Sequence, residues 1–407
     1  MLYVIICILS QLVGQAQTSD YLTKVGKKDS LYSETLKESR TIFVEVPESF
    51  NTNPSNKYPV IILLDGEVLF PIVSNVHQFY SGGFMPETIL VGISNAENRT
   101  RDLTPTKISS KYGMPFSEEN GEAENFLRFI ETELIPHIEK NYPATNYRTL
   151  IGHSYGGLFS LYALIHKSQL FANYLSIDPS LDWDDQILLQ QMNDVLSNTK
   201  LSEKSVYMSL SGQLHMQNPE VTLGNIMNDT TDFTLFSRSN LQFAEIMKTN
   251  SQSDLTFYWQ FYPNDLHGTI PLPSIKDGLL ETFKWFQMEN TAKINNAETS
   301  KDELLKIMAF REAKLKKHFG YAVPPYPEFL LNMSGYMNLE MQQLDKSKMY
   351  FEQALQYYPE SANAHDSMAD YFEAIQNYPS AIKFVTKAYE LSGSDYHKNR
   401  LETLNKK

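Results

Sequence analysis

The sequence predicts an α/β fold, in which a mostly parallel sheet is covered by helices on both faces, followed by an all-helical C-terminal region. Two observations predict the first part. Short apolar runs typical of doubly buried strands alternate with amphipathic segments between about residues 40 and 290. One of these strands leads into a glycine-flanked serine, Ser154, and directly on into a helix. The helical part is predicted by residues 303–407, which show only helical patterns.

The chain begins with an apolar run, residues 2–9, that is too short to span a bilayer comfortably. The small residues Gly14 and Ala16 follow at a spacing that a signal peptidase accepts, so residues 1–16 are predicted to be a cleaved signal peptide. Cys7 is the only cysteine and would leave with this segment. We therefore expect a secreted or periplasmic protein, with no membrane span after cleavage. A bacterial periplasm fits a mature chain without disulfides.

Residues 40–46 alternate as in a strand, and residues 59–64 form a continuous apolar run that predicts a central strand. Residues 89–93 are a further buried strand, and a polar loop with several charges follows them. Because loops at the carboxyl ends of parallel strands line the ligand crevice, Arg101 of this loop is a candidate to bind an anionic group of the substrate. An ordinary solvated charge is the alternative.

Residues 122–140 form an amphipathic helix, and the next strand ends in Gly152-His-Ser154-Tyr-Gly156. Strand, Gly-x-Ser-x-Gly turn and helix, in this order, are the nucleophile elbow of the α/β-hydrolases. A Cβ at either glycine is expected to collide with the neighbouring backbone. In that fold the oxyanion hole is formed by the amide after the nucleophile, here Tyr155, and by an amide of the loop after an earlier strand, here Gly66 or Glu67.

A serine nucleophile needs a base, and in this fold the base is a histidine near the C-terminal end of the sheet. His267 lies in a turn-rich loop after the predicted strand 255–261, and a helix follows over about residues 273–288. His215, which also follows a predicted strand, is the main rival. Trp183 lies among carboxylates after the strand 174–177 and could form a wall of the substrate site.

The formal net charge is −13, from 48 acidic and 35 basic residues without a basic cluster. Nucleic acid is therefore not expected as a partner, because phosphate binding needs concentrated lysine and arginine. No metal or organic cofactor is implied. We expect a hydrolase domain over residues 17–290, a polar linker over residues 291–302 and a helical domain over residues 303–407.

The helical domain carries small and aromatic residues at positions typical of tetratricopeptide repeats. Ala354 and Ala388 are 34 residues apart, which is the period of that repeat. Residues 303–319 are expected to supply a helix that joins the array to the hydrolase domain. Two readings stay open for this domain: a helical appendage that covers an apolar patch, or a concave surface that binds a protein or peptide partner.

Through five motifs, the chain resembles the esterase family that includes esterase D, feruloyl esterases and the enterochelin (trilactone siderophore) esterases. The motifs are Gly-His-Ser-Tyr-Gly-Gly at 152–157, Leu-Leu-Asp-Gly at 63–66, Asn-Arg-Thr-Arg-Asp-Leu-Thr-Pro at 98–105, Asp-Pro-Ser-Leu-Asp-Trp at 178–183 and Leu-His-Gly at 266–268. The resemblance spans about residues 40–288. It implies that Ser154 attacks an ester carbonyl and that His267 takes its proton and returns it to the leaving alkoxide.

The resemblance leaves the third catalytic residue open. Family members with a full triad place a carboxylate in the loop after the strand that corresponds to residues 206–210, and Gln213 stands about where that carboxylate is expected. Either Glu220, or less favourably Asp265, reaches His267, or the enzyme works as a Ser-His dyad, as the siderophore esterases are thought to. The dyad is slightly favoured.

The expected function is hydrolysis of a small-molecule carboxylic ester, with an enterochelin-type siderophore as the leading substrate. A feruloyl- or acetyl-type carbohydrate ester is the alternative. A non-catalytic protein that binds a partner through its helical repeats is the reading from a different functional class.

Overall fold

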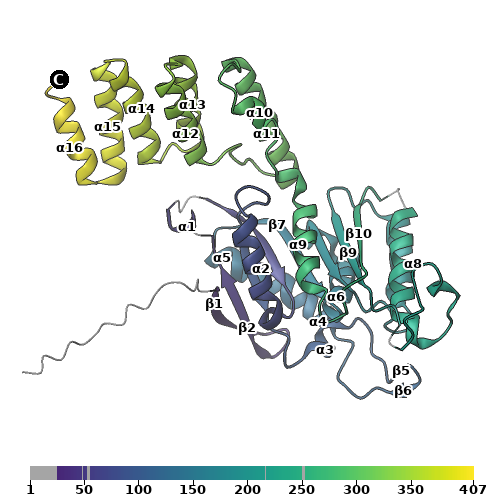
Figure 1. The fold of residues 1–407 in the computed structure, drawn as a ribbon. Helices are drawn as coiled ribbons and strands as arrows, with labels where there is room; N and C mark the ends of the chain where they lie inside the picture. The colour runs from purple at the N-terminus through teal and green to yellow at the C-terminus, as the bar shows by residue number, and fades with distance from the viewer. Residues whose placement is uncertain (1–24, 48, 53–55, 216, 250–252) are drawn as a thin grey trace, which may run out of the picture.

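The computed structural model describes residues 25–47, 49–52, 56–215, 217–249 and 253–407. The predicted signal peptide, residues 1–16 with Cys7, lies outside the described residues. The chain forms a sheet domain from which a row of helices extends (Figure 1). Within the described ranges, no helix combines the length and the apolar character needed to cross a membrane.

The predicted α/β architecture is confirmed by an eight-stranded sheet with the strand order β1-β2-β4-β3-β7-β8-β9-β10. The six strands from β4 to β10 are parallel, and β1 and β2 pair antiparallel at one edge. The strands are β1 (Lys27–Ser33), β2 (Glu38–Glu45), β3 (Tyr58–Leu63), β4 (Ile89–Ile93), β7 (Ala144–His153), β8 (Asn173–Ile177), β9 (Ser205–Ser211) and β10 (Thr256–Tyr262).

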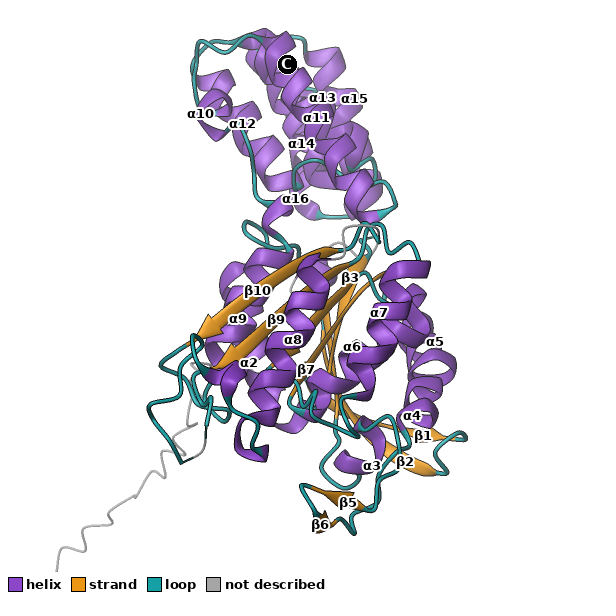
Figure 2. Ribbon diagram, turned by 90° about the vertical axis from the view of Figure 1, so that its right-hand side faces the viewer, coloured by secondary structure: helices purple, strands orange, loops and turns teal. Residues whose placement is uncertain are grey.

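The central strand β3 is buried on both faces, as its continuous apolar run predicts. Val60 and Ile62 pack into the core on one face, and Ile61 and Leu63 pack into the core on the other. The first face is covered by α4 (Ala123–Phe129), η1 (Ile130–Leu134), α5 (Ile135–Asn141), α6 (Tyr155–Lys167), α7 (Ile187–Asn198) and α8 (Leu235–Thr249). The second face is covered by α2 (Gly66–Tyr80) and α9 (Pro271–Thr282). Figure 2 shows this layered arrangement.

Several short elements connect these layers. The predicted helix over residues 122–140 is present as three joined segments, because η1 inserts a π-helical turn between α4 and α5. The other short elements are α1 (Ser49–Thr52), α3 (Arg99–Leu103), β5 (Ser110–Lys111), β6 (Met114–Pro115), η2 (Ser168–Leu170), η3 (Ile226–Asn228), η4 (Asp232–Thr234) and η5 (Lys284–Phe286).

The C-terminal region consists of helices and the loops that connect them, as predicted. The helices are α10 (Thr291–Ile294), α11 (Lys301–Phe319), α12 (Glu328–Glu340), α13 (Leu344–Tyr357), α14 (Ala362–Ala374), α15 (Tyr378–Ser392) and α16 (Asp395–Leu404). The predicted linker therefore contains the short helix α10. Ala354 and Ala388, the pair at the 34-residue spacing, are both fully buried. The arrangement fits paired helical repeats, and their identity as tetratricopeptide repeats stays a prediction.

Helix α11 belongs to both parts of the molecule. Its C-terminal end buries Leu315 and Phe319 in the core beside α2 and α9, where the Phe319 ring lies 5.1 Å from the ring of Tyr147. Its N-terminal part buries Leu304 and Met308 among the helices of the repeat region. The expectation that residues 303–319 join the array to the hydrolase domain is consistent with these contacts.

The helical region docks at the edge of the sheet where the parallel strands begin. Tyr147 lies near the start of β7, and the neighbouring Thr145 Oγ1 lies 3.0 Å from the Tyr321 hydroxyl. The strand arrowheads in Figure 2 point away from the repeats. Ser154 follows the other end of β7, so the repeats cannot cover it from this position.

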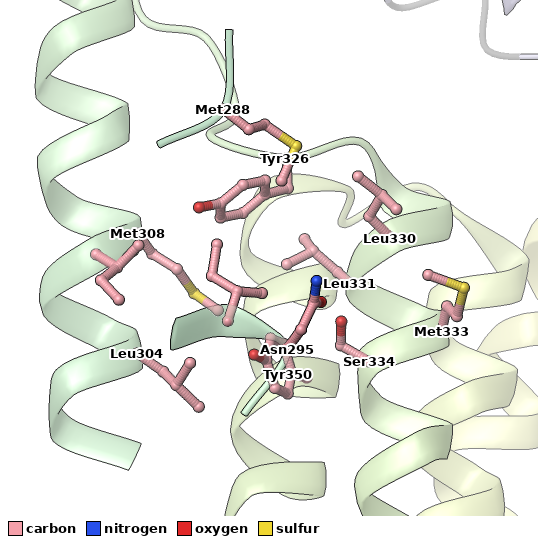
Figure 3. Close-up of a pocket in the computed structure, with 12 residues that line it drawn as sticks. Met288, Asn295, Leu304, Met308, Tyr326, Leu330, Leu331, Met333, Ser334 and Tyr350 are labelled. Carbon is pink, nitrogen blue, oxygen red and sulfur yellow. The ribbon is translucent and has the colours of Figure 1, made fainter. Parts of the chain in front are cut away.

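The junction also contains an apolar cavity of about 70 Å³. Figure 3 shows Leu304 and Met308 entering it from one helix and Met333 and Ser334 entering it from another. This cavity is lined by the repeat region and the segment before it, and none of its residues belongs to the nucleophile elbow.

Candidate active site

The nucleophile elbow holds Ser154 in a strained backbone conformation, with φ 60° and ψ −117°. The turn is fixed on both sides, because the Ser154 N–H donates to Ile177 O at 3.0 Å and the Ser154 carbonyl accepts the N–H of Leu158 at 2.9 Å. Such strain persists only where the surroundings fix it, and it is typical of active-site residues. The serine hydroxyl is thereby presented at the carboxyl end of β7.

Of the two glycines that flank Ser154, only Gly152 is required to avoid a collision with the backbone. A Cβ on Gly152 would lie 2.1 Å from the carbonyl oxygen of Gly156, which is a severe collision. A Cβ on Gly156 would meet Leu64 and Asp65 at 3.5 Å, an ordinary contact distance. The expected backbone collision at Gly156 is therefore wrong, because the chain there has already turned into α6 and a Cβ would meet only side chains at ordinary contact distances.

Ser154, His267 and Asp178 form a hydrogen-bonded chain. Ser154 Oγ lies 3.1 Å from His267 Nε2, and His267 Nδ1 lies 2.7 Å from Asp178 Oδ2. The Asp178 side chain is fully buried, and its other oxygen accepts the backbone N–H of Ser211 at 2.9 Å. The carboxylate can therefore fix the imidazole with Nδ1 protonated, leaving Nε2 to accept the serine proton.

Glu220, the first candidate for the acid, has no contact with His267, and the slightly favoured Ser-His dyad does not describe the geometry either, because Asp178 contacts the imidazole. Glu220 lies exposed in the loop after β9, where its backbone N–H donates to Asn218 and its carbonyl accepts from Asn225. The carboxylate of Asp265 is also engaged elsewhere, since it accepts the hydroxyl of Thr269. The carboxylate that contacts His267 comes instead from the end of β8, one strand earlier than expected. Asp178 directly follows a parallel strand, which is the signal that could have identified it.

Gln213, at the position expected for the acid, has a different contact. Its side-chain oxygen accepts the backbone N–H of His267 at 3.1 Å, so it fixes the histidine loop and not the imidazole. The rival His215 lies in the same loop, and its Nδ1 accepts the amides of Gln217 and Asn218. It is therefore committed to the loop's own structure.

The amides predicted for the oxyanion hole lie at the N-termini of two helices. Gly66 and Glu67 begin α2, and Tyr155 begins α6. First-turn amides have no acceptor within their own helix, and the helix dipole favours negative charge there. A Cβ on Gly66 would lie 2.8 Å from the carbonyl carbon of Gly92, so glycine allows α2 to begin close against β4.

The two residues predicted to bind substrate, Arg101 and Trp183, are both engaged with other parts of the protein. Arg101 pairs with Glu38 of β2 at 2.7 Å and with the buried Asp102 at 2.8 Å. Trp183 is fully buried, and its indole N–H donates to Thr106 O at 3.1 Å. A buried carboxylate needs cationic partners, and a buried indole needs an acceptor, so both side chains are held by structural contacts. Arg101 is therefore committed to ion pairs, and Trp183 packs against Tyr155 but is fully buried, so it does not form an exposed wall.

Two other cations lie beside the elbow. The Arg99 guanidinium carbon lies 5.5 Å from the centre of the Tyr155 ring, and Lys111 Nζ lies 5.3 Å from it. Lys111 is carried by β5 and pairs with Asp182 at 3.1 Å. These contacts, rather than those of Arg101, bring positive charge next to the residue that follows the nucleophile.

His153 packs against His267, with ring centres 4.6 Å apart. Burial, and then the neighbouring His267, lowers the pKa of His153 to about 4. His153 is therefore neutral near pH 7 and places no positive charge against the His267 ring. Phe236 contacts the His267 ring edge-on at 5.3 Å, so the base is held between two rings while about a third of its side chain stays exposed.

Comparison with known proteins agrees with this architecture. Residues 33–269 match the family model described as "Putative esterase". The chain is 32% identical over 209 residues to the ferri-bacillibactin esterase BesA of Bacillus subtilis, covering 48% of this chain and 72% of that protein. It is 38% identical over 158 residues to the siderophore enterobactin esterase of Emericella nidulans, covering 35% of this chain and 52% of that protein.

Solved structures of other proteins also superimpose on this chain. An IroE-like serine hydrolase from Shewanella oneidensis superimposes with a TM-score of 0.66 at 28% identity, covering 82% of this chain and 99% of that one. The BES protein from Bacillus cereus shares the fold, with a TM-score of 0.54 at 24% identity, covering 64% of this chain and 97% of that one. Because the family model matches more than half of the chain, the protein belongs to this esterase family and is a hydrolase that acts on ester bonds.

Proposed function

We propose that the protein is a serine esterase that works through a Ser154-His267-Asp178 triad and an acyl-enzyme. The observation that carries this proposal is the continuous chain of contacts from Ser154 Oγ through His267 to Asp178, at 3.1 Å and 2.7 Å. Three residues from three separate strand ends meet in this order, which a scaffold without activity would not require. The non-catalytic reading is therefore not favoured.

In the proposed reaction, Ser154 Oγ attacks the ester carbonyl carbon while His267 Nε2 takes the serine proton. The carbonyl oxygen becomes an oxyanion, which the amide of Tyr155 and the amide of Gly66 or Glu67 stabilise. The tetrahedral adduct then collapses, the C–O bond to the alcohol breaks, and His267 returns its proton to the leaving alkoxide. Water, activated by His267, hydrolyses the resulting acyl-enzyme and restores the serine.

A siderophore ester is the proposed substrate. The support comes from relatives, since BesA and the Emericella enzyme are both named for siderophore hydrolysis. Lys111, which lies beside Tyr155, would suit an anionic or aromatic acyl group. Secretion to the periplasm or beyond is part of the proposal and rests on the pattern of residues 1–16 alone. Binding of a protein partner by the helical repeats stays a prediction.

The test combines labelling with turnover. A fluorophosphonate probe and p-nitrophenyl acetate are applied to the wild type, Ser154→Ala and His267→Ala, and a catecholate trilactone and a feruloyl sugar ester are then compared as substrates. The proposal expects labelling and turnover by the wild type and loss of both in Ser154→Ala. If the wild type neither labels nor turns over any of these esters, the serine mechanism is wrong. Preference for the sugar ester would instead reassign the substrate.

A further inference from the structure

Arg99, the first residue of α3, contacts every segment that supplies a proposed oxyanion amide. Its Nε and Nη2 donate to the two carboxylate oxygens of Asp65 at 2.8 and 2.9 Å. Nη2 also donates to the carbonyl oxygen of His153 at 3.0 Å, and the guanidinium packs on the ring of Tyr155. One side chain thus connects the start of α2 with the nucleophile elbow.

Asp65 determines where α2 begins. Its backbone is left-handed, with φ 51° and ψ 44°, which is unfavourable for a residue with a side chain. Its N–H donates to Asn95 Oδ1 at 3.1 Å, and its carbonyl accepts the amides of Val68 and Leu69 at 2.9 and 3.0 Å. The orientation of Asp65 therefore sets the direction of the following amides, those of Gly66 and Glu67.

The contact with His153 acts on the other half of the hole. The His153 carbonyl belongs to the peptide that leads into Ser154, so fixing this oxygen limits rotation of the peptide plane before the nucleophile. Tyr155, whose ring packs on the same guanidinium, provides the second proposed amide. A bidentate guanidinium with a further donor can make all of these contacts at once, whereas an ammonium presents a single point charge.

Helix α3 is itself anchored, so it holds Arg99 in place. The next carboxylate on this helix, Asp102, is fully buried and pairs with both Arg40 of β2 and Arg101. Arg101 also pairs with Glu38 of β2. The buried Asp102–Arg40 pair therefore fastens α3 to the antiparallel edge of the sheet and directs Arg99 toward the elbow, while Arg101 adds only a more exposed ion pair that a lysine could also make.

We infer that Arg99 is a positioning residue that sets the spacing of the two halves of the oxyanion hole, through the Asp65 carboxylate on one side and the His153 carbonyl on the other. The inference rests on the proposed serine esterase function. Its consequence is specific. Stabilisation of the tetrahedral oxyanion depends on Arg99, whereas binding of the planar ester does not, so a change at Arg99 lowers kcat and leaves KM nearly unchanged.

The experiment compares Arg99→Lys, Asp65→Asn, the double variant of these two and Arg99→Ala with the wild type. The control is Arg101→Lys, the same substitution two residues along the same helix, in a side chain that also pairs with carboxylates. Each variant is assayed with a neutral aryl ester, and with an aryl boronic acid whose adduct on Ser154 Oγ is tetrahedral. Unfolding in urea is measured in parallel.

We expect kcat to fall about tenfold or more in Arg99→Lys and in Asp65→Asn, with a matching rise in the inhibition constant of the boronic acid. KM should change less than about threefold, and the double variant should be little worse than either single one, because both break the same link. Arg101→Lys should stay within about twofold of the wild type in kcat. Methylguanidine should restore part of the activity of Arg99→Ala and none of that of Ser154→Ala.

Other results would overturn the inference. A rise in KM that is confined to anionic esters, with unchanged boronic acid affinity, would make Arg99 a substrate-binding residue. Equal kcat losses in Arg99→Lys and Arg101→Lys would reduce its role to general stability. If Arg99→Lys does not fold, the inference is judged on Asp65→Asn alone, from its kcat and its inhibition constant for the boronic acid. Absence of wild-type labelling and turnover would instead contradict the proposed function, which is a separate outcome.

Discussion

Asp178 Oδ2 lies 2.7 Å from His267 Nδ1, although the two residues are 89 positions apart and follow strands that are not neighbours in the sheet. The strand between them, β9, ends in Ser211, whose N–H donates to the other Asp178 oxygen. The carboxylate is thus fixed by the last residue of β9. The resemblance had placed the acid in the loop that follows this strand. The proposed triad instead takes its acid from the end of β8.

Replacing Asp178 should therefore cost far more activity than replacing Glu220. Asp178→Asn keeps the shape of the side chain but removes the charge that favours the imidazolium, so kcat for an aryl ester should fall about 10³-fold to 10⁴-fold with little change in KM. Glu220→Ala should stay within about twofold of the wild type, because the Glu220 side chain is exposed. Loss of less than about tenfold in Asp178→Asn would restore the dyad mechanism.

The two elbow glycines should respond differently to the same substitution. Gly152→Ala places a methyl group 2.1 Å from the Gly156 carbonyl oxygen, so the strand and the helix must separate. We expect a loss of roughly 1–3 kcal/mol in the free energy of unfolding and a strong loss of phosphonate labelling. Gly156→Ala has 3.5 Å of clearance and should change the free energy of unfolding by less than about 1 kcal/mol. Similar urea midpoints for the two variants would contradict this difference.

Local patterns predicted the elbow and the histidine loop, since strand, turn and helix signals stand next to the reacting residues in the sequence. The acid could not be predicted in this way. Asp178 and Glu220 both lie in polar segments after strands, and only the path of each loop in space decides which carboxylate meets His267.

The substrate-binding expectation failed for a related reason. Arg99 and Arg101 are two residues apart on α3, and two residues turn a helix by about 200°, so one points to the elbow and the other to β2. In so short a helix, the sequence does not reveal which residues face the elbow and which face β2. Trp183 was misplaced because its polar neighbours suggested a surface loop, whereas Thr106, 77 positions away, accepts its indole N–H.

Stability should fall on acidification because of His77 in α2. Burial lowers the pKa of His77 to about 4, although a hydrogen bond with the Pro86 backbone opposes this, and its Nε2 accepts the N–H of Thr88 at 2.9 Å. The folded state therefore binds the proton less readily than the unfolded chain. Its contribution to stability is fully present above about pH 6.5 and is lost as the pH falls toward 4.

Between pH 7.5 and pH 5.0, the predicted loss from His77 is about 2 kcal/mol in the free energy of unfolding. Urea unfolding at the two pH values measures it. The control is His77→Gln, whose side-chain oxygen can still accept the Thr88 N–H but does not titrate, and which should show a loss smaller by about this amount. His153 contributes with the same sign and remains in both proteins. An equal pH dependence in the two proteins would show that His77 titrates normally.

Helix α11 should contribute to the stability of the sheet domain, and two of its phenylalanines allow a matched test. Phe319 is 5% exposed and packs against Tyr147, Trp285 and Tyr321, whereas Phe310, on the same helix, is 58% exposed. Phe319→Ala should lower the free energy of unfolding by about 3–5 kcal/mol, because it leaves a cavity beneath the start of β7. Phe310→Ala should change it by less than about 0.5 kcal/mol. Tryptophan fluorescence during urea unfolding should follow this loss, since Trp285 lies in the affected cluster. If both variants unfold at the same urea concentration, α11 serves the repeats alone and the sheet domain is complete without it.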